Sequence, residues 1–228
     1  MESYVNQSLS NLNVETIDLL QMHCPPTEVY SSDHTFEMLD YLVSKGKIQN
    51  YGFSVETVDQ ALECIKKPQT KSIQVIFNIF RQKPAEKLFK IAKEKKVAII
   101  VRVPLASGLL SGKFDKNSSF ATDDHRNYNI NGEAFDVGET FSGVNYSKAL
   151  EAVEELKNIV PTEVTLSQLS LKWILMHEAV SVVIPGAKNK DHVHLNTAST
   201  EIKEISSLMN EISDIYTKYF HDDVHHRW

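Results

Sequence analysis

The chain has 228 residues, of which 42% are hydrophobic and 24% charged, with a formal net charge of −6. This is an ordinary globular composition that can bury a core, and acids interrupt the lysines, as in Lys93-Glu94-Lys95, so no basic face indicates nucleic acid. Two cysteines cannot build a disulfide framework, and no window approaches the ~18–20 apolar residues of a membrane span. We therefore expect a soluble cytoplasmic protein with no nucleic-acid or membrane partner.

Short apolar runs recur along the chain and predict buried strands. They cover residues 17–22, 50–53, 73–77, 97–103 and 180–184. Their apolar positions are consecutive and do not alternate with polar ones, which is typical of parallel strands covered on both faces.

Amphipathic stretches between these runs predict helices. Each carries apolar residues three and four apart: Phe36, Leu39 and Val43; Val58, Ala61, Leu62 and Ile65; Leu88, Ile91 and Ala92; Leu166, Leu169 and Trp173; and Ile205, Leu208, Met209, Ile212, Ile215, Tyr216 and Tyr219. Gly46 is placed to end the first helix, and Pro84 to lie in the first turn of the third. Thr165 and Gln168 form a capping-box pattern before the fourth.

The alternation of strands and helices predicts an α/β fold with a parallel sheet. Two architectures compete: an open, flavodoxin-like sheet, or five strands of an eight-stranded barrel. No glycine-rich GxGxxG turn follows any predicted strand, which favours the barrel.

Two segments fall outside the alternation. Residues 114–147 are rich in Asp, Asn, Gly and Ser, and they predict a long loop over the active-site face of a single domain spanning residues 1–228. In the tail, His221 and His225 are four residues apart. No third ligand on a rigid element accompanies them, so we expect a frayed tail and no metal site.

Four blocks of the sequence, in order and correct spacing, resemble the aldo-keto reductase family. Residues 16–26 (TIDLLQMHCPP) resemble its fourth strand, residues 46–54 its junction into the fifth, residues 102–113 its seventh-strand loop, and residues 184–196 its eighth-strand cofactor segment. The resemblance implies a partial (β/α)₈ barrel: strands four to eight with their helices and a C-terminal helix, without the first three βα units.

The same resemblance implies an NADP(H) site. Its residues are Ser54, Gln74, Arg102, Pro104, Leu105, Ser107, Gly108, Lys113, Gly186, Lys188, His192 and Asn196. Ser54 and Gln74 correspond to groups that hold the nicotinamide carboxamide, and Arg102 stands where many relatives stack an aromatic ring. Residues 104–113 correspond to the pyrophosphate turn. Lys188, Lys190 and His192 occupy the stretch that binds the 2′-phosphate, which favours NADP over NAD, and Asn196 corresponds to an adenine contact.

On the catalytic side the resemblance is limited to His23, which corresponds to the histidine that orients the carbonyl oxygen. Nothing in this sequence matches the family's aspartate, tyrosine and lysine motifs, and the buried or half-buried thiol expected at Cys24 has no matched base. The resemblance thus implies NADP-dependent reduction of an aldehyde or ketone to an alcohol, or the reverse, without efficient turnover by this chain alone.

Other readings remain open from the sequence. The chain could be a non-catalytic NADP-binding or interaction module, a fragment of an interrupted reductase, or a flavodoxin-like carrier. Unpaired strand edges in an incomplete barrel further predict an oligomer or a complementary N-terminal polypeptide as partner.

Overall fold

The computed structural model describes residues 1–228, and its sheet has five parallel strands in sequential order. The strands are β1 (Ile17–His23), β2 (Ile48–Val55), β3 (Thr70–Ile76), β4 (Ala98–Arg102) and β5 (Val180–Val183). Each strand pairs with the next one along the chain, which is the order of a (β/α)₈ barrel, whereas a flavodoxin-like sheet begins with its second strand at the edge. The barrel-type fold is therefore confirmed and the flavodoxin-like alternative is wrong.

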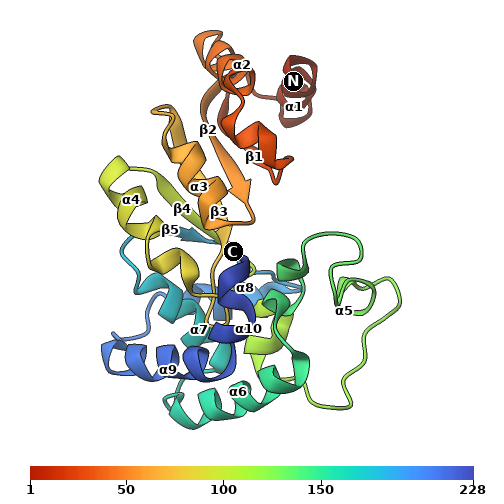
Figure 1. The fold of residues 1–228 in the computed structure, drawn as a ribbon, viewed down its shortest axis with the longest axis vertical. Coiled ribbons are helices and arrows are strands. Elements are labelled where there is room, and N and C mark those ends of the chain that lie inside the picture. Colours follow the sequence, from red (N-terminus) through yellow and green to blue (C-terminus); the bar gives the residue numbers. More distant parts are fainter.

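Helices and short 3₁₀ turns connect and cover the strands (Figure 1). The α-helices are α1 (Glu2–Leu12), α2 (Asp33–Ser44), α3 (Val58–Ile65), α4 (Leu88–Lys95), α5 (His125–Tyr128), α6 (Tyr146–Ile159), α7 (Leu166–Leu175), α8 (Lys190–Ala198), α9 (Met209–Tyr219) and α10 (His221–Val224). The 3₁₀ turns are η1 (Thr27–Ser31), η2 (Lys83–Ala85), η3 (Ala106–Ser111), η4 (Val137–Glu139), η5 (Phe141–Gly143), η6 (Ser206–Leu208) and η7 (His225–Arg227). None of the helices is long and apolar enough to cross a membrane.

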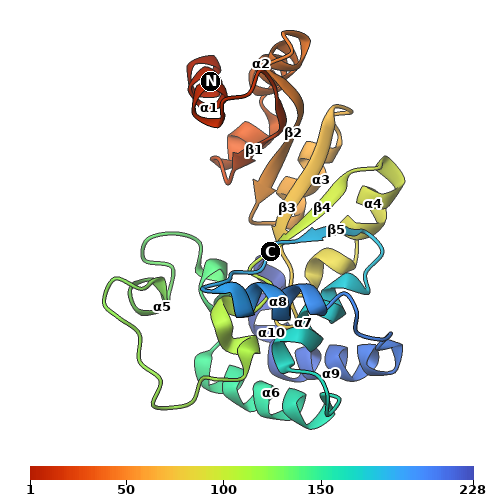
Figure 2. The same ribbon diagram turned by 180° about the vertical axis from the view of Figure 1, so that it is seen from behind.

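The sheet does not close into a barrel. β1 pairs only with β2, and β5 only with β4, so both keep a free edge (Figures 1 and 2). The central strands are largely buried, as predicted, but Leu19 of β1 is 37% exposed and Val182 of β5 is 47% exposed. The prediction that all the strands are covered on both faces is therefore wrong for β1 and β5, because side chains project from the faces of a sheet and those of Leu19 and Val182 are left partly uncovered.

The predicted start and stop signals are found with one exception. Thr165 and Gln168 form a reciprocal capping box at the start of α7, and Gly46 adopts the left-handed conformation just after α2. Pro84 lies in η2, because α4 begins only at Leu88. The expectation that Pro84 lies in the first turn of that helix is therefore wrong.

Two further expectations about helices need correction. After Leu39 in α2 the next buried residue is Leu42, whereas Val43 is 37% exposed. Spacings of three and of four residues both lie on one helix face, so the sequence pattern does not distinguish the two. The helix α1 was not anticipated, since Val5 is the only residue that it buries.

The tail after α9 is ordered, so the prediction of a frayed end is wrong. α10 and η7 continue the chain, and Val224 and Trp228 are 1% and 5% exposed. The hydroxyl of Tyr216 lies 2.9 Å from Nδ1 of His225, whose Nε2 is 3.1 Å from a carboxylate oxygen of Glu86. The second contact joins residues far apart in the sequence, and together the two contacts hold the tail against the body.

Candidate active site

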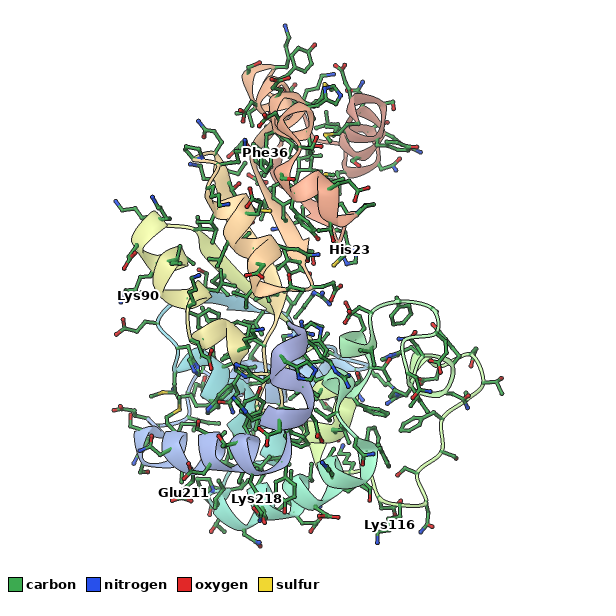
Figure 3. All side chains as sticks on the ribbon, in the orientation of Figure 1. His23, Phe36, Lys90, Lys116, Glu211 and Lys218 are labelled. Carbon is green, nitrogen blue, oxygen red and sulfur yellow. The ribbon has the colours of Figure 1, made fainter.

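The structure brings together the predicted residues at the carboxyl ends of the first three strands. His23 of β1 is the register partner of Ser54 in β2, and Ser54 is the partner of Gln74 in β3. His23 is exposed at the end of β1 (Figure 3), Gln74 is half-buried, and Ser54 is fully buried. Gly186 lies beyond β5, at the edge of the sheet opposite to β1. In the open sheet, His23 and Gly186 therefore belong to opposite edges.

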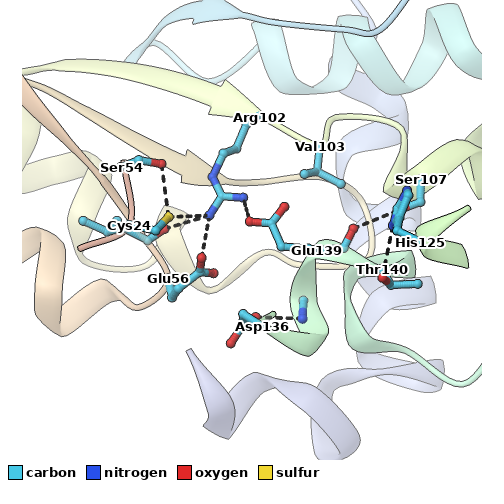
Figure 4. Close-up of polar contacts among 12 residues, drawn as sticks. Cys24, Ser54, Glu56, Arg102, Val103, Ser107, His125, Asp136, Glu139 and Thr140 are labelled. Atoms are coloured by element: carbon cyan, nitrogen blue, oxygen red, sulfur yellow. Dashed lines mark hydrogen bonds and ion pairs between the residues drawn. The ribbon is translucent and has the colours of Figure 1, made fainter. Parts of the chain in front are cut away.

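Arg102, at the end of β4, reaches across this rim to the ends of β1 and β2 (Figure 4). One terminal nitrogen, Nη2, donates to Glu56 Oε1 at 3.1 Å, to the carbonyl of Val55 at 3.2 Å and to Cys24 Sγ at 3.5 Å. The other, Nη1, forms an ion pair with Glu139 from the 114–147 segment. Arg102 is only 6% exposed, so its charge is satisfied inside the protein and does not face solvent.

Burial and charge act in opposite directions on this cluster. Burial by itself lowers the pKa of Arg102, but the carboxylates of Glu139 and Glu56 outweigh it and raise that pKa. Burial raises the pKa of Glu139 despite the neighbouring guanidinium. Burial also raises the pKa of Cys24 to about 11, so Cys24 is a neutral thiol at pH 7, and its Sγ donates to Ser54 Oγ at 3.4 Å.

The ligand-type atoms of Cys24, Glu56 and Glu139 lie within 4.8 Å of one another, as they would around a metal ion. The guanidinium of Arg102 hydrogen-bonds to all three side chains. The positive charge that a metal would supply to this cluster is therefore already supplied by Arg102.

The predicted pyrophosphate turn follows β4 in an unusual backbone conformation. Val103, Ala106 and Ser107 have φ angles of 51°, 47° and 55°, and Gly108 has 98°. Positive φ is costly for residues with a side chain, above all a β-branched one, and such residues gather at functional sites. In the same turn Pro104 is buried, and Lys113 lies exposed just after it.

The hydroxyl of Ser107 is already engaged by the 114–147 segment. It donates to the carbonyl of Glu139 at 3.0 Å and accepts from the backbone N–H of Phe141 at 3.0 Å. Leu105 precedes it and is partly buried against the core. The segment is thus fastened both to the turn, through Ser107, and to Arg102, through the Glu139 side chain.

The predicted adenosine-side residues form one compact turn at the start of α8. Asn189 caps the helix by accepting from the N–H of His192 at 2.9 Å, and the N–H of Lys188 donates to His192 Nδ1 at 3.3 Å. Asn196 Nδ2 donates to the carbonyl of Gly186 at 3.2 Å. Lys188 and Lys190 are exposed, and no ion pair engages either of them.

Four residues near the rim were missed by the sequence analysis: Glu56, Glu139, Arg81 and Trp228. Glu56 directly follows β2, so the rule that the active-site residues of such barrels lie at the carboxyl ends of the strands could have found it. Glu139 carries no such signal, because 37 residues separate it from Arg102. Arg81 is 1% exposed and lies 3.9 Å from the ring of Trp228, a contact that no local pattern encodes.

Comparison with known proteins identifies relatives of this chain. YhdN, an aldo-keto reductase of Bacillus subtilis, is 27% identical over 220 residues, which cover 92% of this chain and 63% of the relative. The yakc aldo-keto reductase [NADP(+)] of Schizosaccharomyces pombe is 24% identical, with 94% of this chain and 61% of the relative covered. This chain thus spans less than two thirds of the length of either relative.

Solved structures share the fold. An aldo-keto reductase from Bacillus halodurans superposes with a TM-score of 0.72 at 24% identity, covering 99% of this chain and 68% of that one. The glycerol dehydrogenase of Gluconobacter oxydans gives a TM-score of 0.76 at 23% identity, covering 96% and 64%. The profile of the aldo/keto reductase family matches residues 1–217. This chain belongs to the aldo/keto reductase family.

Proposed function

We propose that this chain binds NADP(H) at the carboxyl ends of its strands and serves the reduction of an aldehyde or ketone to an alcohol, or the reverse oxidation. The observation that carries the proposal is the alignment of His23, Ser54 and Gln74 on adjacent parallel strands. When bound, the cofactor supplies or accepts the hydride. The side chains of this chain then bind and orient the reacting groups.

The polar groups on the nicotinamide side fit a carboxamide. The amide of Gln74 makes no side-chain hydrogen bond inside the protein, so both its donor and its acceptor are free. Ser54 accepts the thiol proton of Cys24, which leaves its own hydroxyl proton free to donate. His23 is exposed beside Ser54 and can orient a carbonyl oxygen.

The start of α8 fits a phosphate group. Lys188 and Lys190 stand at the N-terminus of a nine-residue helix, where the helix dipole also favours an anion. One carboxylate, that of Asp191, lies in the same turn, so the cations outnumber it. This arrangement supports NADP(H) over NAD(H), because only the former carries the additional 2′-phosphate.

Carbonyl reduction also needs a proton on the oxygen. Tyr30 is the tyrosine whose hydroxyl contacts the rim, but it donates to the carbonyl of Ser54 at 3.0 Å, and burial raises its pKa. It is therefore a poor proton donor for a substrate. The absence of a general acid typically costs about 10²–10⁴-fold in rate. We therefore propose that turnover requires a proton donor from outside residues 1–228.

Cofactor binding tests the first half of the proposal. Purified chain is titrated with NADPH and separately with NADH, and the nucleotide fluorescence is followed. We expect NADPH to bind at least about tenfold more tightly, since charge-assisted contacts contribute about 1.5–3 kcal/mol. Replacing both Lys188 and Lys190 with alanine should remove the difference, whereas Lys90→Ala, an exposed lysine on α4, should not change it. No NADPH binding at millimolar concentration would sink the proposal.

Turnover tests the second half. A panel of neutral aldehydes is assayed with the chain alone and together with the part of YhdN that this chain does not match. We expect NADPH oxidation only in the mixture, and its loss with His23→Ala. Rapid turnover by the chain alone would refute the need for an added proton donor. Binding without turnover in every combination would favour the non-catalytic module, which the internal ion pairs of Arg102 also support.

A further inference from the structure

A cavity of about 540 Å³ lies among the helices, and no strand contributes to its walls. The walls come from the residues around η2, the end of α7, one side of α9 and the tail that follows α9 (Figure 1). None of the residues assigned above to the cofactor or the carbonyl group lines it. Volumes of about 300–1,000 Å³ are typical of small-molecule sites, so this cavity is large enough for a ligand of its own.

His177 offers a hydrogen-bond acceptor to this cavity. Its Nδ1 lies 3.0 Å from the backbone carbonyl of Trp173, and because a carbonyl can only accept, Nδ1 carries the proton. Burial lowers the pKa of His177, so the ring is neutral at pH 7 and Nε2 keeps its lone pair. Nε2 has no hydrogen-bond partner inside the protein and is not shut off from solvent, so it opens into the cavity that His177 lines.

Three aromatic side chains fix the orientation of the His177 ring. The centre of this ring lies 4.7 Å from that of Trp173, 4.8 Å from that of Phe77 and 5.8 Å from that of Phe89, each in an edge-to-face arrangement. An acceptor that is already held in place loses little conformational freedom when a ligand binds. The direction of Nε2 therefore favours a ligand that donates an N–H or O–H at one defined position.

The tail supplies a flat aromatic wall to the same cavity. The rings of His221 and His225 are stacked, with their centres 4.4 Å apart. Both ring nitrogens of His225 are already engaged, Nδ1 by the hydroxyl of Tyr216 at 2.9 Å and Nε2 by Glu86 at 3.1 Å. These contacts hold the wall in place, and they leave the ring surfaces, and not the nitrogens of His225, for contact with a ligand.

The charge of the cavity decides which class of ligand it can hold. No lysine or arginine lines it, and its one carboxylate, that of Glu86, is engaged by His225. A phosphate or carboxylate group would therefore find no lysine or arginine to compensate its charge. Asn210 and Ser213, three residues apart on α9, add an amide and a hydroxyl, which are uncharged polar groups.

We propose that this cavity binds an uncharged, planar heteroaromatic compound whose ring N–H donates to Nε2 of His177. The aromatic rings of the tail cover the flat faces of such a ligand, and the polar side chains of α9 contact its edge. The proposal is independent of the function proposed above, because none of the residues assigned to NADP(H) takes part.

The first experiment compares three related ligands by isothermal titration calorimetry: indole, 1-methylindole and indole-3-carboxylate. We expect indole to bind with a Kd of about 1 mM or below. 1-Methylindole should bind about fivefold more weakly, because it lacks the N–H that His177 accepts, and indole-3-carboxylate should also bind more weakly than indole because it is an anion. The proposal is overturned if indole does not bind at millimolar concentration, if 1-methylindole binds equally well, or if the carboxylate binds more tightly than indole.

The second experiment locates the site with matched variants. His177→Phe keeps an aromatic ring but removes Nε2, and it should abolish the difference between indole and 1-methylindole, whereas His34→Phe, at an exposed position of α2, should preserve it. Ser213→Phe, on the exposed side of α9, fills the cavity and should weaken indole binding by at least about tenfold. Asp214→Phe, at the next exposed position but outside the cavity, should not. Unchanged indole binding by Ser213→Phe would show that the ligand binds elsewhere and would overturn the proposal even if His177→Phe does not fold.

Discussion

Replacing Arg102 with methionine tests the cluster at the rim most directly. The change keeps a long side chain but removes the cation between Glu56 and Glu139, whose side chains are only 19% and 23% exposed. Removing one partner of a buried ion pair typically costs 3–5 kcal/mol, and the partial exposure of both carboxylates places this case at the lower end, about 3 kcal/mol. The expected loss is thus a large part of the stability of an ordinary domain.

The pH dependence of this loss has a definite sign. Without the guanidinium, Glu139 has a higher pKa in the folded protein than in the unfolded chain, because burial already raises its pKa in the presence of Arg102. A group with a raised folded pKa stabilises the protein below its unfolded pKa and loses this effect as the pH rises through the folded pKa. The loss in free energy of unfolding caused by Arg102→Met should therefore be largest at pH 7 and smaller at pH 5.

Urea unfolding at pH 7 and pH 5 measures both effects. A second variant, in which Arg102→Met is combined with Glu56→Gln and Glu139→Gln, removes the uncompensated charges and should recover most of the lost free energy at pH 7. The reasoning is refuted if Arg102→Met costs less than about 1 kcal/mol at pH 7, or if the triple variant is no more stable than the single one.

Two further predictions concern single positions. Gly52→Ala should destabilise the protein by about 2–3 kcal/mol in urea unfolding, because the added β-carbon would lie 2.5 Å from the backbone oxygen of Ser72 in the neighbouring strand. Gly186→Ala, with no atom within 4 Å of its β-carbon, should stay within about 0.5 kcal/mol. Cys24, whose pKa burial raises to about 11, should react with iodoacetamide at pH 7 about a hundredfold more slowly than an ordinary thiol.

The matched controls for these predictions are internal. Equal stability of the Gly52 and Gly186 variants would mean that the close strand contact at Gly52 is not as described. For Cys24, the same alkylation is run in guanidinium chloride, where burial is lost and the reaction should accelerate. A rate in the native protein that equals the denatured rate would contradict the buried thiol.

The sequence predicted the fold well because the relevant signals are local. Consecutive apolar residues identified the strands, the Thr165–Gln168 capping box marked the start of α7, and Gly46 marked the end of α2. Local patterns fail where two spacings fit equally, as for Leu42 and Val43, or where a helix buries little, as α1 does with Val5 alone.

The candidate site was predictable only in part. The register neighbours His23, Ser54 and Gln74 follow from the rule that parallel strands end at one rim. The partners of Arg102 do not, because 46 and 37 residues separate it from Glu56 and Glu139. Which charged residues so far apart in the sequence come into contact depends on how the loops pack on the sheet. The periodicity of the sequence carries no information about loop packing.

The left-handed backbone of Val103 has a consequence for how this protein can be altered. A β-branched residue at a φ of 51° is costly, of order 1–3 kcal/mol, and glycine would adopt the same conformation without that cost. The backbone carbonyl of Val103 accepts a hydrogen bond from Asn78 Nδ2 at 2.9 Å, which helps to hold this peptide in its conformation. A thermostabilising design would therefore target this residue early, but glycine there would also make the turn that we propose for the pyrophosphate more flexible, so a higher melting temperature is expected to come with weaker binding at that proposed site.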